Sequence, residues 1–163
     1  MVTKNSEATA TSERELTITR IFDAPRSLVF KVWTEREHLM RWSGPRDFTI
    51  PFSEADFRPG GAYRTCLRSP EGKDYWLQGV YREIVEPERL VFTHAWEDED
   101  GKPKHETLVT VTFAEHDGKT KLTFHQAIFK SVEARDSHLE GWSECLDRLA
   151  DYLSETSRHG GLN

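Results

Sequence analysis

The sequence is short of cysteine, of long apolar runs and of positive charge. Cys66 and Cys145 are its two cysteines, and neither lies in a CxxC or Cys/His spacing. The sequence therefore predicts reduced thiols, no disulfide framework and no metal site. Its formal net charge of −6 argues against nucleic acid as a partner, because phosphate binding needs a basic surface. No apolar run approaches the roughly 20 residues that cross a bilayer, so no membrane partner is expected.

The sequence also lacks targeting and linker signals. Residues 1–14 are polar, without an apolar stretch of signal-peptide type, which favours a cytoplasmic protein. Residues 15–156 contain no Pro/Gly/Ser-rich linker, no internal repeat and no low-complexity block. A length of 163 residues suits one domain. We therefore predict a single domain at 15–156, between a flexible N-terminal arm at 1–14 and a flexible tail at 157–163.

The first third of the predicted domain combines a strand with two short helices. Residues 15–22 alternate in the manner of a β-strand. Pro25 suits the first position of a helix, and the apolar residues of 28–33 share one helical face. Thr34 and Glu37 have the spacing of a capping box, so a second short helix is predicted to begin there.

The middle of the chain, residues 48–129, has the pattern of an antiparallel strand meander. Turn signals recur about every dozen residues, as expected for consecutive hairpins. They are Pro59-Gly60-Gly61, Glu71-Gly72, Pro87-Glu88, Asp100-Gly101 and Asp117-Gly118.

A long C-terminal helix follows, and Ser131 is its predicted N-cap. Apolar residues then recur at intervals of 7, 3, 4, 3 and 4 over about six turns. They are Val132, Leu139, Trp142, Leu146, Leu149 and Leu153.

Two of the turn signals fix which strand residues share a face. A two-residue turn at Asp100-Gly101 places Trp96 opposite His105, His94 opposite Thr107, Phe92 opposite Val109 and Leu90 opposite Val111. A similar turn at Asp117-Gly118 places Phe113 opposite Leu122, Val111 opposite Phe124 and Val109 opposite Gln126. Both turns give the same apolar face, and a slip of one residue would destroy that agreement.

This apolar face is interrupted by His94, His105, Thr107 and Gln126. The final helix is the only predicted element long enough to cover it, and one helix cannot contact a curved sheet everywhere. Polar groups that converge in an apolar cavity are typical of a small-molecule site, although the same groups could simply satisfy one another. The predicted ligand-binding residues are Phe92, His94, Trp96, His105, Thr107, Val109, Phe124, Gln126, His138, Trp142 and Cys145.

The strand that contains Gly79 does not reveal its inner face. Alternation places Tyr75, Leu77, Gly79 and Tyr81 on one side and Trp76, Gln78, Val80 and Arg82 on the other. Neither side is clearly apolar, and Gly79 is a candidate for a bulge that changes the phase midway. The sequence leaves open whether Trp76 or Tyr81 reaches the pocket.

Several short motifs, in their order, resemble one known superfamily. They are Ala24-Pro25, Trp42, Phe57-Arg58-Pro59-Gly60-Gly61, Gly79-Val80-Tyr81-Arg82-Glu83-Ile84, Pro87-Glu88-Arg89-Leu90-Val91-Phe92-Thr93 and Gly141-Trp142. Over residues 15–155 the chain resembles the START-like, or SRPBCC, superfamily, and within it the branch named after the activator of heat-shock protein 90 ATPase. The resemblance implies the α+β helix-grip (Bet v-like) fold, in which a curved antiparallel sheet wraps around a long C-terminal helix.

The resemblance leaves three functions open. The superfamily includes lipid and hormone carriers, polyketide cyclases, stress-related binding proteins and a co-chaperone domain, and it shares no catalytic motif. It therefore implies no catalytic residue and no cofactor here. The hypotheses are a binding protein for a small hydrophobic ligand, an enzyme of cyclase or hydrolase type that uses His94 or His105 as a general acid/base, and a co-chaperone-like module with a chaperone partner. A monomer and a homodimer are both compatible with the sequence.

Overall fold

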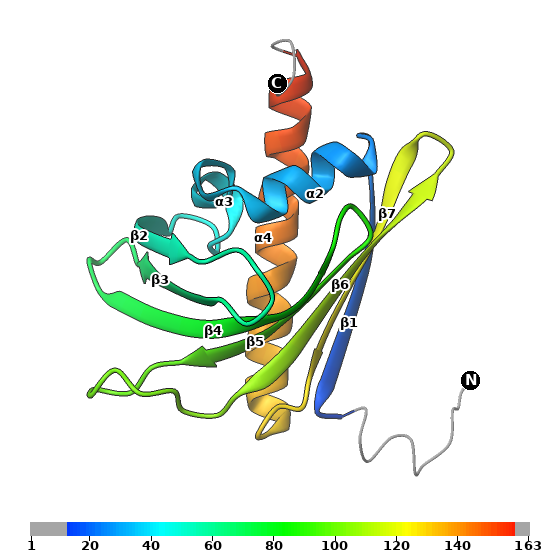
Figure 1. The fold of residues 1–163 in the computed structure, drawn as a ribbon. Coiled ribbons are helices and arrows are strands. Elements are labelled where there is room, and N and C mark those ends of the chain that lie inside the picture. The colour runs from blue at the N-terminus through cyan, green and yellow to red at the C-terminus, as the bar shows by residue number, and fades with distance from the viewer. Residues whose placement is uncertain (1–12, 159–163) are drawn as a thin grey trace.

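A curved antiparallel sheet wraps around the C-terminal helix in the computed structural model, which describes residues 13–158 (Figure 1). The strands are β1 (Glu15–Phe22), β2 (Thr49–Ala55), β3 (Ala62–Arg68), β4 (Asp74–Val85), β5 (Arg89–Trp96), β6 (Thr107–His116) and β7 (Lys119–Ala127). The helices are α2 (Arg26–Thr34), α3 (Arg36–Trp42) and α4 (Val132–Arg158). This arrangement confirms the predicted helix-grip fold. Residues 1–12 and 159–163, on which most of the predicted arm and tail fall, lie outside the described residues.

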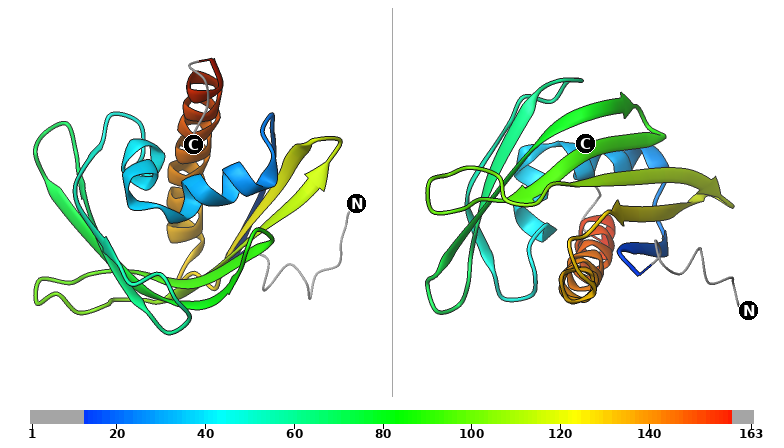
Figure 2. Two further views of the ribbon diagram at one scale, coloured as in Figure 1. Left: turned by 45° about the horizontal axis from the view of Figure 1, so that its top comes forward. Right: turned by 90° about the horizontal axis from the view of Figure 1, so that it is seen from below.

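The seven strands form one sheet in the order β1-β7-β6-β5-β4-β3-β2. Consecutive strands from β2 to β7 are antiparallel neighbours, and β1 closes the series by pairing with β7. Figure 2 shows that the sheet bends into a trough, with α2, α3 and α4 on its inner side. Among the described residues, no helix combines the length and the apolar character needed to cross a membrane.

The predicted register of β5, β6 and β7 is confirmed over most of its length. His94 lies opposite Thr107 and Phe92 opposite Val109, and Val109 in turn lies opposite Gln126. The β6–β7 turn has positive φ at both central residues, 52° at Asp117 and 81° at Gly118. This is the geometry of a type I′ turn, which favours Asp-Gly.

The predicted pairing of Trp96 with His105 is wrong. At the tip of the β5–β6 hairpin, Glu97 pairs with Pro103, and the backbone N–H of Lys104 donates to the Trp96 carbonyl at 2.8 Å. The register at the hairpin tip therefore differs by one residue from the register of the ladder that begins at Thr107. The extra residue lies between Pro103 and Thr107, so His105 is outside the regular strand.

The face of β4 that carries Leu77 and Tyr81 points inward. Leu77 pairs with Trp96 and Tyr81 pairs with Phe92, which are both on the inner face of β5. The β4–β5 ladder is interrupted between these two pairs, but its register is the same on both sides. The predicted phase change at Gly79 is therefore wrong, because the register shifts further along, between Tyr81 and Glu83. The Tyr63 ring from β3 lies over this glycine, and its hydroxyl donates to the Thr93 carbonyl at 2.6 Å.

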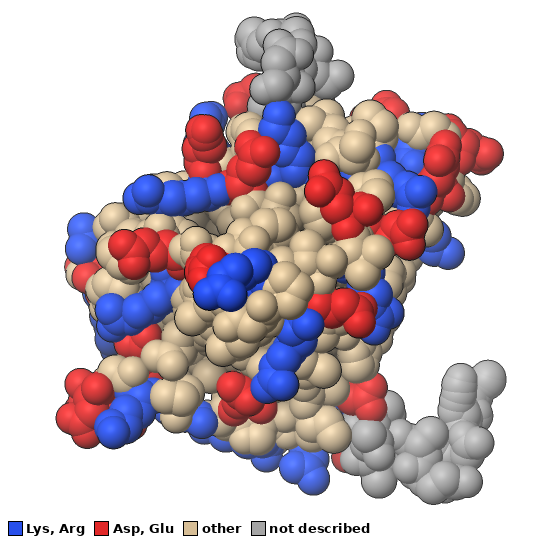
Figure 3. Space-filling view, viewed as in Figure 1, with Lys and Arg blue, Asp and Glu red and all other residues tan. Residues whose placement is uncertain are grey.

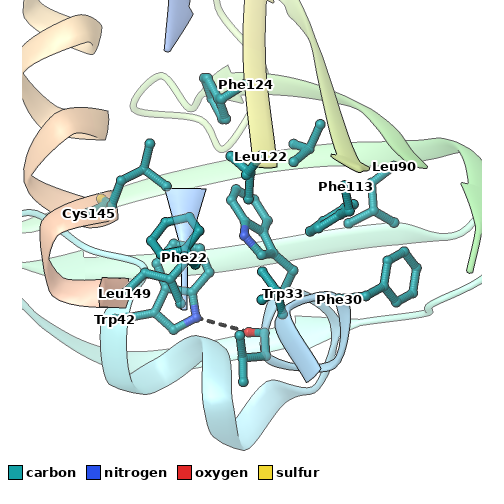
Figure 4. Close-up of a cluster of buried hydrophobic side chains, with 14 of the residues drawn as sticks. Phe22, Phe30, Trp33, Trp42, Leu90, Phe113, Leu122, Phe124, Cys145 and Leu149 are labelled. Carbon is teal, nitrogen blue, oxygen red and sulfur yellow. Dashed lines mark hydrogen bonds between the residues drawn. The ribbon is translucent and has the colours of Figure 1, made fainter. Parts of the chain in front are cut away.

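The two short helices form an aromatic wedge between the sheet and α4. Trp33 and Trp42 meet edge to face at a centroid distance of 4.7 Å, and the Trp42 indole N–H donates to the Val32 carbonyl at 2.9 Å (Figure 4). The Trp33 ring also packs edge to face against Phe113 of β6, with a distance of 6.3 Å between the ring centroids. Burial of these rings stabilises helices that are too short to persist alone.

The local details of these helix ends differ from the prediction. Pro25 is the N-cap residue of α2, one position before the helix. The predicted capping box is wrong: Glu35 is the N-cap of α3, without a side-chain bond, and the Thr34 hydroxyl donates to the Lys31 carbonyl instead. The predicted cap of α4 is confirmed, because the Ser131 hydroxyl accepts a hydrogen bond from the Ala134 N–H at 3.0 Å.

α4 is buried along only part of its length. Leu146, Leu149 and Leu153 of its C-terminal half are at most 4% exposed, whereas Val132 and Leu139 near its start are each 37% exposed. The apolar stripe of the sequence therefore contacts the core only from the middle of the helix onward.

We predict that Gly79→Ala destabilises the protein. An added Cβ would lie 2.0 Å from the Thr93 carbonyl oxygen and 2.5 Å from the Tyr63 ring, and such overpacking costs about 1–3 kcal/mol. Gly141→Ala in α4 is the matched control, because nothing lies within 4 Å of its added Cβ. Alanine in a helix interior should stabilise by about 0.5–1 kcal/mol. Urea denaturation measures both effects, and a neutral Gly79→Ala would contradict this account of the interruption in the β4–β5 ladder.

Candidate functional site

A cavity of about 1010 Å³ lies between the inner face of the sheet, α3 and the first half of α4. This volume is at the upper end of the range of about 300–1,000 Å³ for ligand sites. Most of the large side chains in its wall are aromatic. They are Trp33, Trp42, Phe48, Tyr63, Tyr75, Trp76, Tyr81, Phe92, Trp96 and Trp142.

Six of the eleven residues that the sequence nominated lie in the wall of this cavity. Three come from β5 and three from α4, and they face one another across the space. They are Phe92, His94, Trp96, His138, Trp142 and Cys145. The second line of residues on the helix, spaced by four and three, thus faces the cavity as its periodicity indicated.

The other five nominated residues do not line the cavity. Thr107 and Gln126 are buried and bond to each other: the Gln126 amide donates to the Thr107 hydroxyl at 2.8 Å, which donates to the His94 carbonyl at 3.1 Å. Val109 and Phe124 are fully enclosed in the core. His105 is exposed beyond the end of the ladder, where its Nε2 is 2.6 Å from the Ile128 carbonyl oxygen.

The sequence analysis missed the contribution of the N-terminal half of the chain. Trp33 and Trp42 enter the wall from the two short helices, and Tyr63, Leu77 and Tyr81 enter it from β3 and β4. The spacing of Trp33 and Trp42 on their short helices could have indicated that they face the cavity. The tyrosines could not have been assigned, because the phase of β4 changes at its bulge: the register shifts between Tyr81 and Glu83.

His138 connects the start of α4 to the sheet. Its Nε2 accepts a hydrogen bond from the Trp96 indole N–H at 3.0 Å, and its Nδ1 is 2.8 Å from the Ala134 carbonyl. These two bonds require a neutral ring with the proton on Nδ1. Burial lowers the pKa of His138, which also favours the neutral form. The bond to Trp96 links the start of α4 to the end of β5.

His94 is a deeply buried ionisable group of the cavity wall, at 5% exposure. Burial, followed by the nearby His138, lowers its pKa to about 3, so the ring is neutral at physiological pH. Its ring centroid lies 5.7 Å from that of Trp96 and 6.1 Å from that of Trp142, both edge to face. His94 Nδ1 and Trp33 Nε1 are enclosed atoms of the cavity wall without a hydrogen-bond partner among the described residues.

The charged groups of the wall lie at its rim. Glu97 is held there by Arg64, with two contacts of 2.6 and 2.8 Å, and by the Gln78 amide at 2.9 Å. The bond from Arg64 lowers the pKa of Glu97. The Arg64 guanidinium also lies 4.0 Å above the Trp76 ring, which places that ring on the side of β4 opposite Leu77. This cluster fixes the base of the β5–β6 hairpin beside the cavity.

Cys145 contributes an apolar group to the wall. Burial raises the pKa of its thiol to about 12, so the thiol stays protonated and is not activated as a nucleophile. Within residues 13–158, no three His, Cys, Asp or Glu side chains are grouped as metal ligands.

We predict that stability falls as the pH drops below about 6.5, the ordinary histidine pKa. The folded pKa of His94 is about 3, so the unfolded chain binds a proton in this range that the folded protein does not. The free energy of unfolding should decrease by about 1.4 kcal/mol per pH unit for each such histidine. Urea denaturation at pH 5 to 6.5 measures the slope, and His94→Phe should flatten it. His116→Gln, at the exposed β6–β7 turn, should not; equal slopes in all three proteins would contradict the assignment.

Comparison with known proteins supports the fold and identifies the family. A protein from Arthrobacter aurescens has a similar solution structure, with a TM-score of 0.81 and 26% identity over 89% of this chain and 88% of that one. A protein from Mycobacterium smegmatis has a TM-score of 0.75 and 27% identity over 88% and 92%. The Silicibacter pomeroyi protein named AHSA1 has a TM-score of 0.79 and 25% identity over 86% and 97%. No curated protein matches the sequence.

The family model described as Activator of Hsp90 ATPase homolog 1-like protein matches residues 23–154. The match begins just before α2 and ends near the end of α4, so it contains α2, α3, most of α4 and six of the seven strands. The chain therefore belongs to the Activator of Hsp90 ATPase homolog 1-like protein family, as its resemblance in sequence indicated.

Proposed function

We propose that this protein binds a small hydrophobic, ring-containing molecule in the cavity between the sheet and α4. The observation that carries the proposal is the cavity itself, with its volume of about 1010 Å³ and a mainly apolar wall to which ten aromatic residues contribute. Aromatic rings pack favourably against other rings in offset or edge-to-face geometry. A planar apolar molecule would remove this surface from water, which contributes about 25 cal/mol per Å² of apolar area.

The way in which α4 is held to the sheet supports an open cavity and not a collapsed core. The first half of α4 is joined to β5 by the bond between His138 and Trp96 and by the edge-to-face contact of Trp142 with the His94 ring. Gly141 lies in the cavity wall between His138 and Trp142, and an added Cβ there would meet nothing within 4 Å. A larger side chain at 141 would have filled this space.

The cavity histidines support binding more strongly than acid/base catalysis. A general base is normally oriented by a hydrogen-bonded partner. His138 uses both ring nitrogens in structural bonds, and His94 has no carboxylate bonded to its ring among the described residues. Tight binding of an apolar ligand needs neither group to exchange a proton.

A co-chaperone-like function is the second candidate, and the family match is the observation that favours it. Such a function would use the outer surface, where acidic and basic side chains are interspersed on the face shown in Figure 3. Its test is the ATPase rate of purified heat-shock protein 90 with and without this protein. An increase in that rate that persists when the cavity is filled would establish the second function independently of the first.

We predict that Gly141→Leu weakens ligand binding without unfolding the protein. The leucine side chain would extend into the cavity, whereas Ala150→Leu on the exposed side of the same helix would not. The uncharged fluorescent probe N-phenyl-1-naphthylamine reports binding by its increase in emission. Affinity should fall about 5- to 150-fold in Gly141→Leu, because overpacking a filled site costs about 1–3 kcal/mol, and it should not change in Ala150→Leu.

The wild-type protein must first bind the probe. Failure of the probe and of a broader set of apolar ring compounds to bind, or to raise the melting temperature, would count against the proposal, since any ligand selective for the folded state stabilises it. Equal affinities of Gly141→Leu and the wild type would show that the probe binds elsewhere.

A further inference from the structure

The His94 ring has hydrogen-bonding capacity that the protein does not use. A neutral imidazole carries one donor and one acceptor nitrogen, yet Nδ1 of His94 has no hydrogen-bond partner among residues 13–158. The side chain is more than nine-tenths buried and lies in the cavity wall. Buried polar groups are nearly always paired, and each exception requires an explanation.

The neighbouring polar groups are already committed to other partners. The Trp96 N–H donates to His138 Nε2, and His138 Nδ1 bonds to the Ala134 carbonyl. The Thr107 hydroxyl donates to the backbone carbonyl of His94 and leaves its ring free. Nδ1 of His94 is enclosed by protein, so Nε2 is the ring nitrogen left to meet a molecule in the cavity.

The charge of the cavity wall restricts what that molecule can carry. Its charged side chains are five carboxylates and two lysines, on strand ends and hairpins at the rim: Glu54, Asp74, Glu97, Asp98, Glu99, Lys73 and Lys104. No cationic side chain lies beside His94, whose own ring is neutral. An anionic group there would be desolvated without a counter-charge, and a buried unpaired charge is strongly unfavourable.

A hydroxyl group is the uncharged group that suits His94 in either tautomer. It donates to Nε2 when the proton is on Nδ1, and it accepts from Nε2 when the proton is there. The Trp96 and Trp142 rings lie 5.7 and 6.1 Å from the His94 ring, so a ligand ring that bears the hydroxyl could pack against them.

We propose that the ligand of this cavity is an uncharged ring compound that carries a hydroxyl group, and that this hydroxyl hydrogen-bonds to Nε2 of His94. The inference rests on the proposed binding function and adds the chemical class of the ligand and the side chain that recognises it. His94 is thus a specificity-determining residue, and the Gln126–Thr107 pair positions it through its backbone carbonyl.

The test compares four naphthalene compounds that differ in one substituent. 2-Naphthol, naphthalene, 2-naphthoate and 2-naphthylmethylammonium each compete with N-phenyl-1-naphthylamine for the wild-type protein at neutral pH. We expect 2-naphthol to bind about 2- to 12-fold tighter than naphthalene, which corresponds to one net hydrogen bond. We expect 2-naphthoate to bind at least about tenfold more weakly than 2-naphthol.

The variant His94→Phe keeps an aromatic ring and removes both nitrogens. In this variant the advantage of 2-naphthol over naphthalene should disappear, while the probe still binds. His116→Phe, at the exposed β6–β7 turn, is the control and should keep the wild-type order. The wild-type comparison stands alone if His94→Phe does not fold.

The outcomes separate the inference from the function on which it rests. If the probe binds but naphthalene equals 2-naphthol, or if either charged compound binds more tightly than 2-naphthol, the chemical class is wrong and the binding function survives. An undiminished 2-naphthol preference in folded His94→Phe would remove His94 from recognition. If neither the probe nor any of the four compounds binds, both proposals fail.

Discussion

The structure depends on one constraint: a single helix must cover the inner face of a seven-stranded curved sheet. α4 is deeply buried from Cys145 onward, where Leu146 and Leu149 are fully buried. The wedge of α2 and α3 fills the space near that end, and its Trp33 and Trp42 rings pack against each other and the sheet (Figure 4). Towards the start of α4 no such wedge exists, and the cavity lies there.

Polar contacts help to hold the two walls of the cavity apart. Trp96 and His138 connect the sheet to the helix through one hydrogen bond, and Glu97 and Arg64 fix the rim through a charged pair. Directional bonds of this kind hold groups at a set distance, whereas apolar side chains gain from closer approach. The same bonds use both ring nitrogens of His138 but leave Nδ1 of His94 without a partner among the described residues.

Predictions from the sequence succeeded where the chemistry was local or repetitive. The Asp117-Gly118 turn fixed the β6–β7 register, since Asp-Gly favours the two positive φ angles of that turn. The prediction failed for Trp96 and His105, because the β5–β6 hairpin absorbs an extra residue that no short motif announces. Thr107 and Gln126 were placed on the correct face, but sequence spacing could not show that they bond to each other and not to a ligand.

The sequence by itself determined the order of the elements, the family resemblance, the inner face of β5 to β7 and the cavity-facing line on α4. Each of these follows from periodicity and turn chemistry, which act over a few residues. The tertiary structure alone decided which polar residues line the cavity and which aromatic residues of α2, α3 and β4 join them. Those choices depend on the curvature of the sheet, on the register shift between Tyr81 and Glu83 and on the distance at which α4 is held, and these arise only when segments far apart in the sequence pack together.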